Sequence, residues 1–317
     1  YCVSRRSNDV QRAAFTVQEV VDLTKNFYRR NYIEGLFLSS GIFKNADYTM
    51  ERLEKIAKKL RKEHQFNGYI HLKAIPGASD ELLHEAGLYA DRLSVNIEIP
   101  SEMSLKKVAP EKNYKEVVDP MAYLKTQIKG HKEEKKKIRS TPLFAPGGQS
   151  TQLVVGATPE NDLNVLQLAN GLYKGQALKR VYYSGYIPIE TDNRMPALKA
   201  PPLIRENRLY QADWLMRFYG FSVNEIVSQA HPDLDLEVDP KLAYALRHPE
   251  LFPIDVNTAN YRMILRIPGG DEAREVLPDL WRQSPFESGV APRGHPSPDP
   301  TQTGVQAAHV AIESVLR

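Results

Sequence analysis

The chain is poor in cysteine and has no long apolar run. Cys2 is the only cysteine among 317 residues, so no internal disulfide can form and a reducing, cytoplasmic compartment is expected. No stretch approaches the roughly 20 consecutive apolar residues that span a bilayer, and no signal peptide is visible. With 42% apolar and 26% charged residues, the sequence predicts an ordinary globular protein with no membrane partner.

Net charge is also low, at +3, but it is unevenly distributed. Residues 101–140 carry eleven Lys and Arg against six Asp and Glu, so the rest of the chain is slightly acidic. Within them, "KGHKEEKKKIR" (residues 129–139) interleaves both signs, which is typical of a solvated helix. A surface that faces a polyanion is the alternative.

Helical and strand patterns alternate over the first 190 residues. Apolar residues at helical spacing, as in "TVQEVVDLTKNFYRRN" (16–31), are followed by short apolar runs such as "IEGLFLSSG" (33–41). This alternation implies right-handed βαβ units around a parallel sheet. The predicted fold class is therefore α/β.

The composition changes after residue 189. A Pro-rich linker, "ETDNRMPALKAPPLIREN" (190–207), leads into a region where helical patterns dominate. From residue 271 the pattern deteriorates, and in "SPFESGVAPRGHPSPDPTQTG" (284–304) the Pro and Gly density is too high for a packed core, so the tail 269–317 is expected to be disordered or aberrant. We therefore divide the chain into residues 1–190, 191–268 and 269–317.

Polar and small residues follow the expected strands. Ligands of parallel α/β folds bind at the carboxyl ends of the strands, where this sequence places Ser39, Ser40, Gly41 and Gly156. Ser94, Asn96 and Glu98 alternate along a third strand, so their side chains should share one face. A bound polar ligand would partner these groups, and internal water or cross-strand hydrogen bonds are the alternative.

Several unusual strings resemble the radical SAM superfamily, and within it the proteins assigned to DNA modification or repair. They are "RRSNDVQRAAFT", "RRNYIEGLFLSSG", "GYIHLKAIPGA", "FAPGGQSTQLVVGATPE", "LKRVYYSGYIP" and "PPLIRENRLYQADWLMRFYGF". The resemblance covers roughly residues 1–268. It implies a partial (βα)6 TIM-type barrel that lacks its first strand, followed by a small helical region.

The resemblance implies two cofactors, a [4Fe-4S] cluster and S-adenosylmethionine (SAM). In the superfamily, a C-x3-C-x2-C loop holds three irons through thiolates, and an electron donor reduces the cluster so that SAM yields a 5′-deoxyadenosyl radical. "YC" at Tyr1-Cys2 matches the final aromatic-cysteine pair, so Cys2 is the expected cluster ligand. The other two cysteines and the first strand would lie outside these 317 residues, which alone would be inactive.

The resemblance also assigns SAM contacts. Residues 39–41 stand where a Gly-Gly-Glu-like loop receives the amino group, although the Glu is missing here. Asn96 and Glu98 stand where strand-end residues touch the ribose and the amino acid moiety, and Gly156 lets the backbone approach the adenine. Arg5 or Arg6 would meet the carboxylate. The full expected set is Tyr1, Arg5, Ser39, Ser40, Gly41, Ser94, Asn96, Glu98 and Gly156.

The stretch "PIDVNTANYRMILRIPGG" (253–270) resembles the first half of a helix-hairpin-helix. Glycines of that motif let backbone N–H groups reach a DNA phosphate, so Asn257, Gly269 and Gly270 are the expected nucleic-acid contacts. An ordinary helix that ends at a Pro-Gly stop is the alternative.

Together these features predict a radical SAM enzyme that acts on nucleic acid, in DNA modification or repair. The expected partners are DNA, an electron donor and a DNA-repair protein. Two alternatives stay open: a radical SAM enzyme with a small-molecule or protein substrate, and a nucleic-acid-binding module without catalysis.

Overall fold

The computed structural model describes residues 1–5, 7–189, 194–196, 198–255 and 257–268. Within these ranges the chain forms two compact units. The first comprises residues 1–158 and 171–201, and the second comprises residues 159–170 and 202–268. The expected tail at 269–317 lies outside the described residues, as do Arg6, Gly269 and Gly270.

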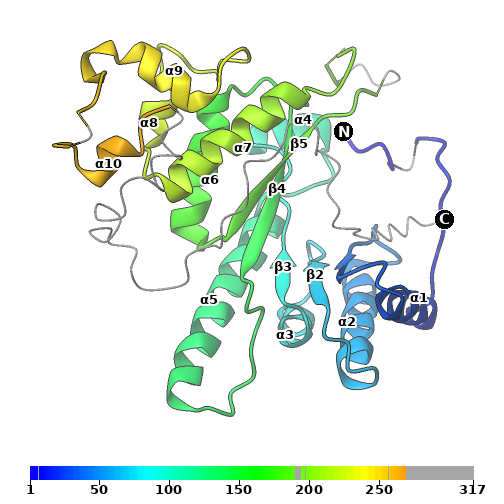
Figure 1. The fold of residues 1–317 in the computed structure, drawn as a ribbon. Coiled ribbons are helices and arrows are strands. Elements are labelled where there is room, and N and C mark those ends of the chain that lie inside the picture. The colour runs from blue at the N-terminus through cyan, green and yellow to red at the C-terminus, as the bar shows by residue number, and fades with distance from the viewer. Residues whose placement is uncertain (6, 190–193, 197, 256, 269–317) are drawn as a thin grey trace. The chain divides into compact units, whose positions relative to one another are not determined.

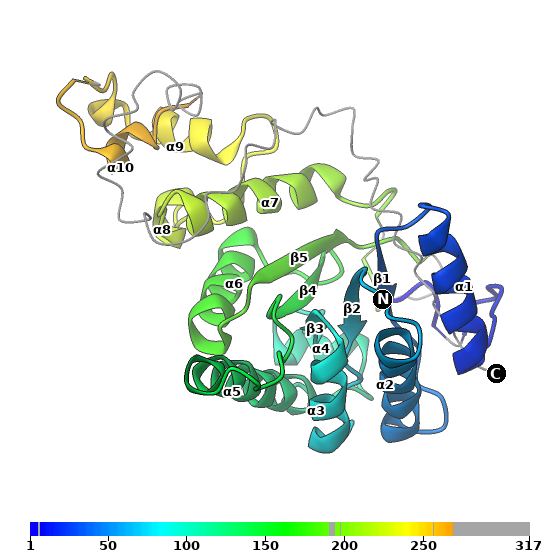
Figure 2. The ribbon, with the colours of Figure 1, turned by 60° about the horizontal axis from the view of Figure 1, so that its bottom comes forward.

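The first unit is built on one five-stranded parallel sheet. Its strands lie in chain order: β1 (Gly35–Leu38), β2 (Tyr69–Lys73), β3 (Arg92–Ser94), β4 (Gln149–Val155) and β5 (Arg180–Gly185). The sheet curls into a half-barrel, which is plainest in Figure 2. This confirms the predicted α/β class and, in outline, the partial barrel.

Helices cover the convex face of this sheet. The first unit contains α1 (Val17–Arg29), α2 (Ala46–Lys62), α3 (Asp80–Tyr89), α4 (Glu102–Val108), α5 (Lys115–Lys137) and the end of α6 (Asp162–Gln176). Helices α2, α3 and α5 pack side by side along the outside of the strands (Figures 1 and 2). The start of α1 follows from its sequence, because Thr16 and Glu19 form a reciprocal capping box.

The two faces of the sheet differ in chemistry. Most side chains that point to the convex face are apolar and buried; among them are Leu36, Leu38, Ile70, Leu72, Leu93, Leu153, Val155, Val181 and Tyr183, and the buried polar exceptions include Gln149 and Thr151. The concave face carries rings and polar groups instead. There the His71 ring meets the Phe37 ring edge-on at 4.8 Å between centroids, and its Nε2 lies 3.5 Å from Ser150 Oγ. Tyr182 lies on this face, whereas Tyr183 belongs to the core.

Strand β3 is shorter than its apolar alternation predicts. The ladder to β4 ends at Ser94, which pairs with Ser150, and pairing returns as a single bridge between Glu98 and Leu153. Four residue steps from Ser94 to Glu98 therefore match three steps from Ser150 to Leu153 on β4, which is a β-bulge. The bulge displaces the residues around Glu98 from regular strand geometry.

The second unit is helical. It contains the first half of α6, then α7 (Leu203–Phe218), α8 (Val223–Ile226), α9 (Pro240–Arg247), the 3-10 turn η1 (Pro249–Leu251) and α10 (Tyr261–Ile264). Helix α7 ends two residues before Gly220, whose φ of +67° favours glycine, and Pro240 occupies the first turn of α9. Asn260 caps α10, which spans only four residues.

Candidate cofactor-binding site

Glu98 occupies the carboxyl edge of the half-barrel in an unusual backbone conformation. Its φ is +62°, and the Ile99 N–H donates to the Ile97 carbonyl across it at 2.7 Å. This is a γ-turn of the rare left-handed kind, with Glu98 at its apex. Strand β4 holds the turn, because the Glu98 N–H donates to Gln152 O at 2.8 Å and Val154 N–H donates to Glu98 O.

Two lysines and a tyrosine converge on the Glu98 carboxylate. Lys73 Nζ, from the last residue of β2, lies 3.5 Å from Oε1, and Lys112 Nζ, from the loop after α4, lies 3.4 Å from Oε2. The Tyr1 hydroxyl donates to the same Oε2. The Lys112 ammonium also lies over the Tyr1 ring, 4.9 Å from its centroid. We call Tyr1, Lys73, Glu98 and Lys112 the Glu98 cluster.

The cluster sets the ionisation of its members. Burial raises the pKa of Glu98, but the Lys112 and Lys73 ammonium groups and the Tyr1 hydrogen bond outweigh burial and lower that pKa below 4.5. Burial and the Glu98 carboxylate raise the pKa of Tyr1, so its phenol stays protonated and donates. At neutral pH the cluster therefore holds one carboxylate and two ammonium groups, with a net charge of +1.

Tyr1 brings Cys2 to this edge. The Tyr1 ring packs against an apolar cluster that includes Ile99, Leu105 and Tyr186. Cys2 is exposed next to it, and its carbonyl accepts the Arg5 N–H at 3.1 Å. The predicted metal ligand, Cys2, is therefore the next residue after Tyr1, whose hydroxyl donates to Glu98.

Internal hydrogen bonds already satisfy several predicted residues. Asn96 donates from Nδ2 to Gln152 Oε1 at 3.1 Å, on the concave face, and Ser94 is buried between its neighbours in the sheet. The Arg5 Nε donates to Asn8 Oδ1 at 3.0 Å. Asn96 and Glu98 therefore both have polar partners within the protein.

Residues 39–41 lie at the end of β1. Ser39 and Ser40 line a pocket together with Phe15, Phe43 and Arg52, between the start of α1 and α2. The Ser40 hydroxyl donates to the Gly41 carbonyl at 2.7 Å. None of the four residues of the Glu98 cluster lines this pocket.

Gly156 follows β4 with a φ of +85°, in the left-handed region that favours glycine. It lies one residue beyond Val155, the last residue of the ladder to β5. Its backbone is therefore at the same carboxyl edge as Glu98 and Lys73, as predicted for a residue that approaches a ligand.

Sequence analysis missed Lys73 and Lys112. The sequence could have indicated Lys73, because this residue shares a face of β2 with His71 and ends that strand, where ligands bind. Lys112 had none: it lies 14 residues after Glu98 in a loop, and only the folded chain brings it to the carboxylate.

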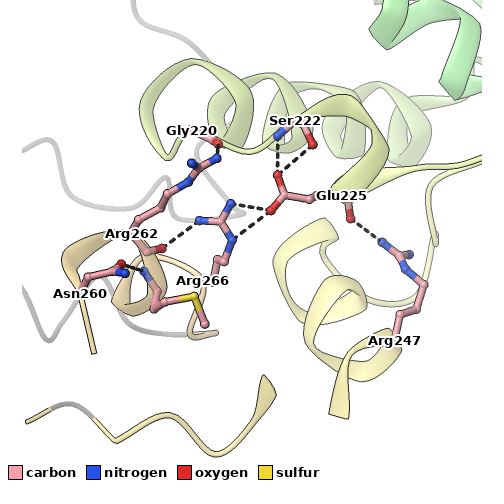
Figure 3. A network of polar contacts seen from close by, with 8 residues as sticks. Gly220, Ser222, Glu225, Arg247, Asn260, Arg262 and Arg266 are labelled. Carbon is pink, nitrogen blue, oxygen red and sulfur yellow. Dashed lines mark hydrogen bonds and ion pairs between the residues drawn. The ribbon is translucent and has the colours of Figure 1, made fainter. Parts of the chain in front are cut away.

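In the second unit, the arginines of α10 and of the turn that follows it serve internal contacts, as Figure 3 shows. Arg266, only 4% exposed, donates from Nε to Glu225 Oε1 at 3.1 Å, and Arg262 donates from Nη2 to Gly220 O at 3.1 Å. Asn260 Oδ1 accepts the Met263 N–H as the helix cap. These bonds attach α10 to the corner between α7 and α8.

Of the three predicted nucleic-acid contacts, the structure describes Asn257. Asn257 is exposed, and its backbone and amide N–H groups both donate to Asp255 Oδ1. Gly269 and Gly270 lie outside the described residues, as does any second helix of a hairpin. The helix-hairpin-helix therefore stays a prediction.

The donor set of this chain does not fit the implied iron–sulfur cluster. Such a cluster takes its protein ligands as thiolates, and the 317 residues contain one cysteine where the superfamily motif has three. In the described ranges, no group of three or more His, Cys, Asp or Glu side chains is placed to hold a metal ion. None of the described helices is long and apolar enough to cross a bilayer.

Comparison with known proteins does not assign the chain to a family. No family model matches the sequence, and no curated protein matches it.

Proposed function

We propose that this chain is the SAM-binding half-barrel of a radical SAM enzyme that acts on nucleic acid. The observation that carries the proposal is the Glu98 cluster: one carboxylate and two ammonium groups at the carboxyl edge of a parallel sheet, beside the only cysteine. Ligands of parallel α/β sheets bind at that edge.

The cluster is complementary to the methionine end of SAM, which carries an ammonium and a carboxylate. Glu98 would accept hydrogen bonds from the ligand's amino group, while Lys73 and Lys112 would meet its carboxylate. The Tyr1 hydroxyl holds Glu98 in place. The left-handed backbone at Gly156 would leave room for the adenosine along the same edge.

The proposal for these 317 residues stops at binding. A [4Fe-4S] cluster needs three thiolates of the motif, and Cys2 is one, so these residues alone supply a binding site and no radical step. What the chain supplies is a preorganised carboxylate in a partly buried setting, where charge-assisted hydrogen bonds are strong.

A nucleic-acid substrate is supported by the charge of the first unit. Counted on the sequence, residues 1–158 and 171–201 carry 31 Lys and Arg against 21 Asp and Glu. Residues 159–170 and 202–268 carry 7 against 11. Phosphate backbones are bound mainly by such basic surfaces.

A nucleic-acid-binding module without catalysis is the second candidate function. The basic first unit supports it, because such a module needs only contacts to phosphates.

Equilibrium dialysis of radiolabelled SAM against the purified chain tests the binding proposal. We expect saturable binding at one site per chain, competed by S-adenosylhomocysteine and more weakly by methionine alone. A folded chain, verified by circular dichroism, that shows no saturable SAM binding would overturn the proposal and favour the second candidate.

The radical SAM assignment has its own test. Placing an engineered Cys-x3-Cys-x segment before Tyr1 completes the three-cysteine motif. After anaerobic reconstitution we expect about four irons and four sulfides per chain, and replacing Cys2 by Ser should abolish them. Iron and sulfide near zero in the engineered chain would contradict the assignment.

A further inference from the structure

Positive charge is concentrated in one part of the first unit. Residues 120–158 and 171–189 contain ten Lys and Arg but only two Asp and Glu, Glu133 and Glu134. Residues 140–158 and 171–189 contain no acidic residue at all. Residues 120–158 and 171–189 therefore carry eight of the first unit's ten excess positive charges.

Four lysines of α5 form a stripe along one side of the helix. Lys125, Lys129, Lys132 and Lys136 are spaced by four, three and four residues, so they share a face over about 16 Å of helix. Glu134 falls on the opposite side of the helix at this spacing. Glu133 pairs with Lys136 at 2.8 Å.

The stripe continues onto neighbouring elements. Lys125 Nζ donates to Gly175 O, in the last turn of α6, at 2.6 Å. Gln149, the first residue of β4, donates to the carbonyls of Met121 and Gln176 and so joins the two helices. Two exposed lysines, Lys174 and Lys179, flank this junction. We call Lys125, Lys129, Lys132, Lys136, Lys174 and Lys179 the basic surface.

Most of the basic surface has no internal role. Lys129, Lys132, Lys174 and Lys179 are exposed and form no ion pair or side-chain hydrogen bond with any described residue. By contrast, Lys135 joins the end of α5 to the loop that follows it, by donating to Thr141 O at 2.8 Å. Cations in a last helical turn are explained by the helix dipole, but Lys129 and Lys132 lie before that turn.

The like charges are unfavourable for the helix on its own. Lysines three and four residues apart repel one another and destabilise a helix. A polyanion that lies along the stripe would offset this repulsion, and lysine ammonium groups bind phosphate without regard to base sequence.

The basic surface is separate from the Glu98 cluster. Helix α5 runs antiparallel to the strands and extends past the first residues of β4, beyond the amino edge of the sheet (Figure 1). The Glu98 cluster lies at the carboxyl edge.

We infer that the basic surface binds the phosphate backbone of a nucleic acid. The inference rests on the proposed function only for the choice of nucleic acid as the polyanion. It assigns the backbone contact to the first unit, whereas the described residues of the second unit are acidic in sum and use Arg262 and Arg266 internally.

Fluorescence anisotropy of a short labelled duplex, measured over a series of KCl concentrations, tests this inference. The test variant replaces Lys129, Lys132, Lys174 and Lys179 by Gln. Each phosphate contact contributes about 0.9 to the slope of log K against log salt. We therefore expect the slope of the four-lysine variant to be shallower by about 3.6 and its affinity to fall at least about tenfold at low salt.

The matched control replaces Lys55, Lys62, Lys106 and Lys115, four exposed lysines elsewhere on the first unit, by Gln. It removes the same charge, and we expect its slope to stay near that of the unaltered chain. Equal losses in both variants would overturn the inference, because they would show a response to net charge alone.

Two parallel measurements separate this inference from its rivals. Ile138 and Leu143 are exposed next to α5, so anionic phosphatidylserine vesicles are tested as well. Lysine-dependent binding to vesicles but not to the duplex would overturn the inference.

SAM binding is measured on the same variants. Lysine-dependent duplex binding without any SAM binding would sustain this inference while the proposed function fails.

Discussion

At the scale of single residues, the backbone of Glu98 is held in a conformation that a glutamate rarely adopts. A non-glycine residue in the left-handed region costs on the order of 1–3 kcal/mol, and Glu98 has a φ of +62°. Two backbone hydrogen bonds to β4, at Gln152 and Val154, maintain it. Conformations of this kind gather at sites where a side chain must be aimed, here between Lys73 and Lys112.

The first prediction concerns the Glu98 charge. Glu98→Gln removes the carboxylate that would receive the ammonium of SAM, and a hydrogen bond to a charged group contributes about 1.5–3 kcal/mol. We expect the Kd for SAM to rise by about 10- to 100-fold in calorimetric titration.

Glu102→Gln is the control for this variant. Glu102 pairs with Lys106 on the exposed side of α4, so its replacement makes the same change in net charge. Equal loss of affinity in both variants would contradict a direct role for Glu98.

A second prediction follows from the lowered pKa of Glu98. Because that pKa lies below 4.5, binding that needs the carboxylate should persist to acidic pH and be lost as the pH falls through the folded-state value. Tyr1→Phe removes a hydrogen bond that stabilises the ionised form, so the pKa rises and binding is lost at a higher pH.

SAM affinity measured against pH checks this shift. Tyr114→Phe is the control, since Tyr114 packs on the same apolar cluster and donates to Pro100 O rather than to Glu98. An unchanged midpoint in Tyr1→Phe would show that the hydroxyl does not tune Glu98.

Individual site residues were predictable from the sequence only where they follow a strand. Glu98 and Gly156 were expected at the carboxyl edge and lie there. The Glu98–Lys112 ion pair was not predictable, because its position depends on how the loop after α4 folds back. Periodicity reports the face of an element and carries no information about loop placement.

At the scale of elements, β3 shows why alternation is an incomplete guide. Ser94, Asn96 and Glu98 alternate in the sequence, yet the bulge between the Ser94 pair and the Glu98 bridge breaks the regular ladder. One inserted residue leaves the hydrophobic pattern unchanged while it re-aims the side chain that follows. The helices were easier, since the Thr16 cap of α1 and the proline at the first position of α9, Pro240, mark where these helices begin.

The third prediction concerns the attachment of α10. Arg266 is nearly buried and pairs with Glu225, which also caps α8 through Ser222. Arg266→Ala leaves that carboxylate without its cation, and we expect the second unit to lose about 2–3 kcal/mol of stability in urea denaturation. The exposed Arg262, which donates to a single carbonyl, provides the comparison: Arg262→Ala should cost less than about 1 kcal/mol.

Similar losses of stability in the two arginine variants would show that the Arg266–Glu225 pair stabilises the second unit no more than the Arg262 hydrogen bond does. In that case α10 would be held mainly by apolar contacts, such as those of the buried Ile264.

At the scale of the whole molecule, the first unit places two differently charged groups of side chains at opposite edges of one sheet. The Glu98 cluster, with its mixed charges, lies at the carboxyl edge. The basic surface lies towards the amino edge, along α5. A small ligand with an ammonium and a carboxylate group, such as SAM, and an extended polyanion should therefore bind independently, and neither should displace the other.

Hydrogen–deuterium exchange measured with and without SAM tests the central claim most directly. We predict protection in the segments at the carboxyl ends of the strands, residues 95–112 and 155–158 above all, and none in residues 129–139 at the end of α5. Duplex DNA should reverse this pattern. Protection by SAM that is absent from residues 95–112, or confined to another part of the chain, would contradict the assignment of the Glu98 cluster as the SAM site.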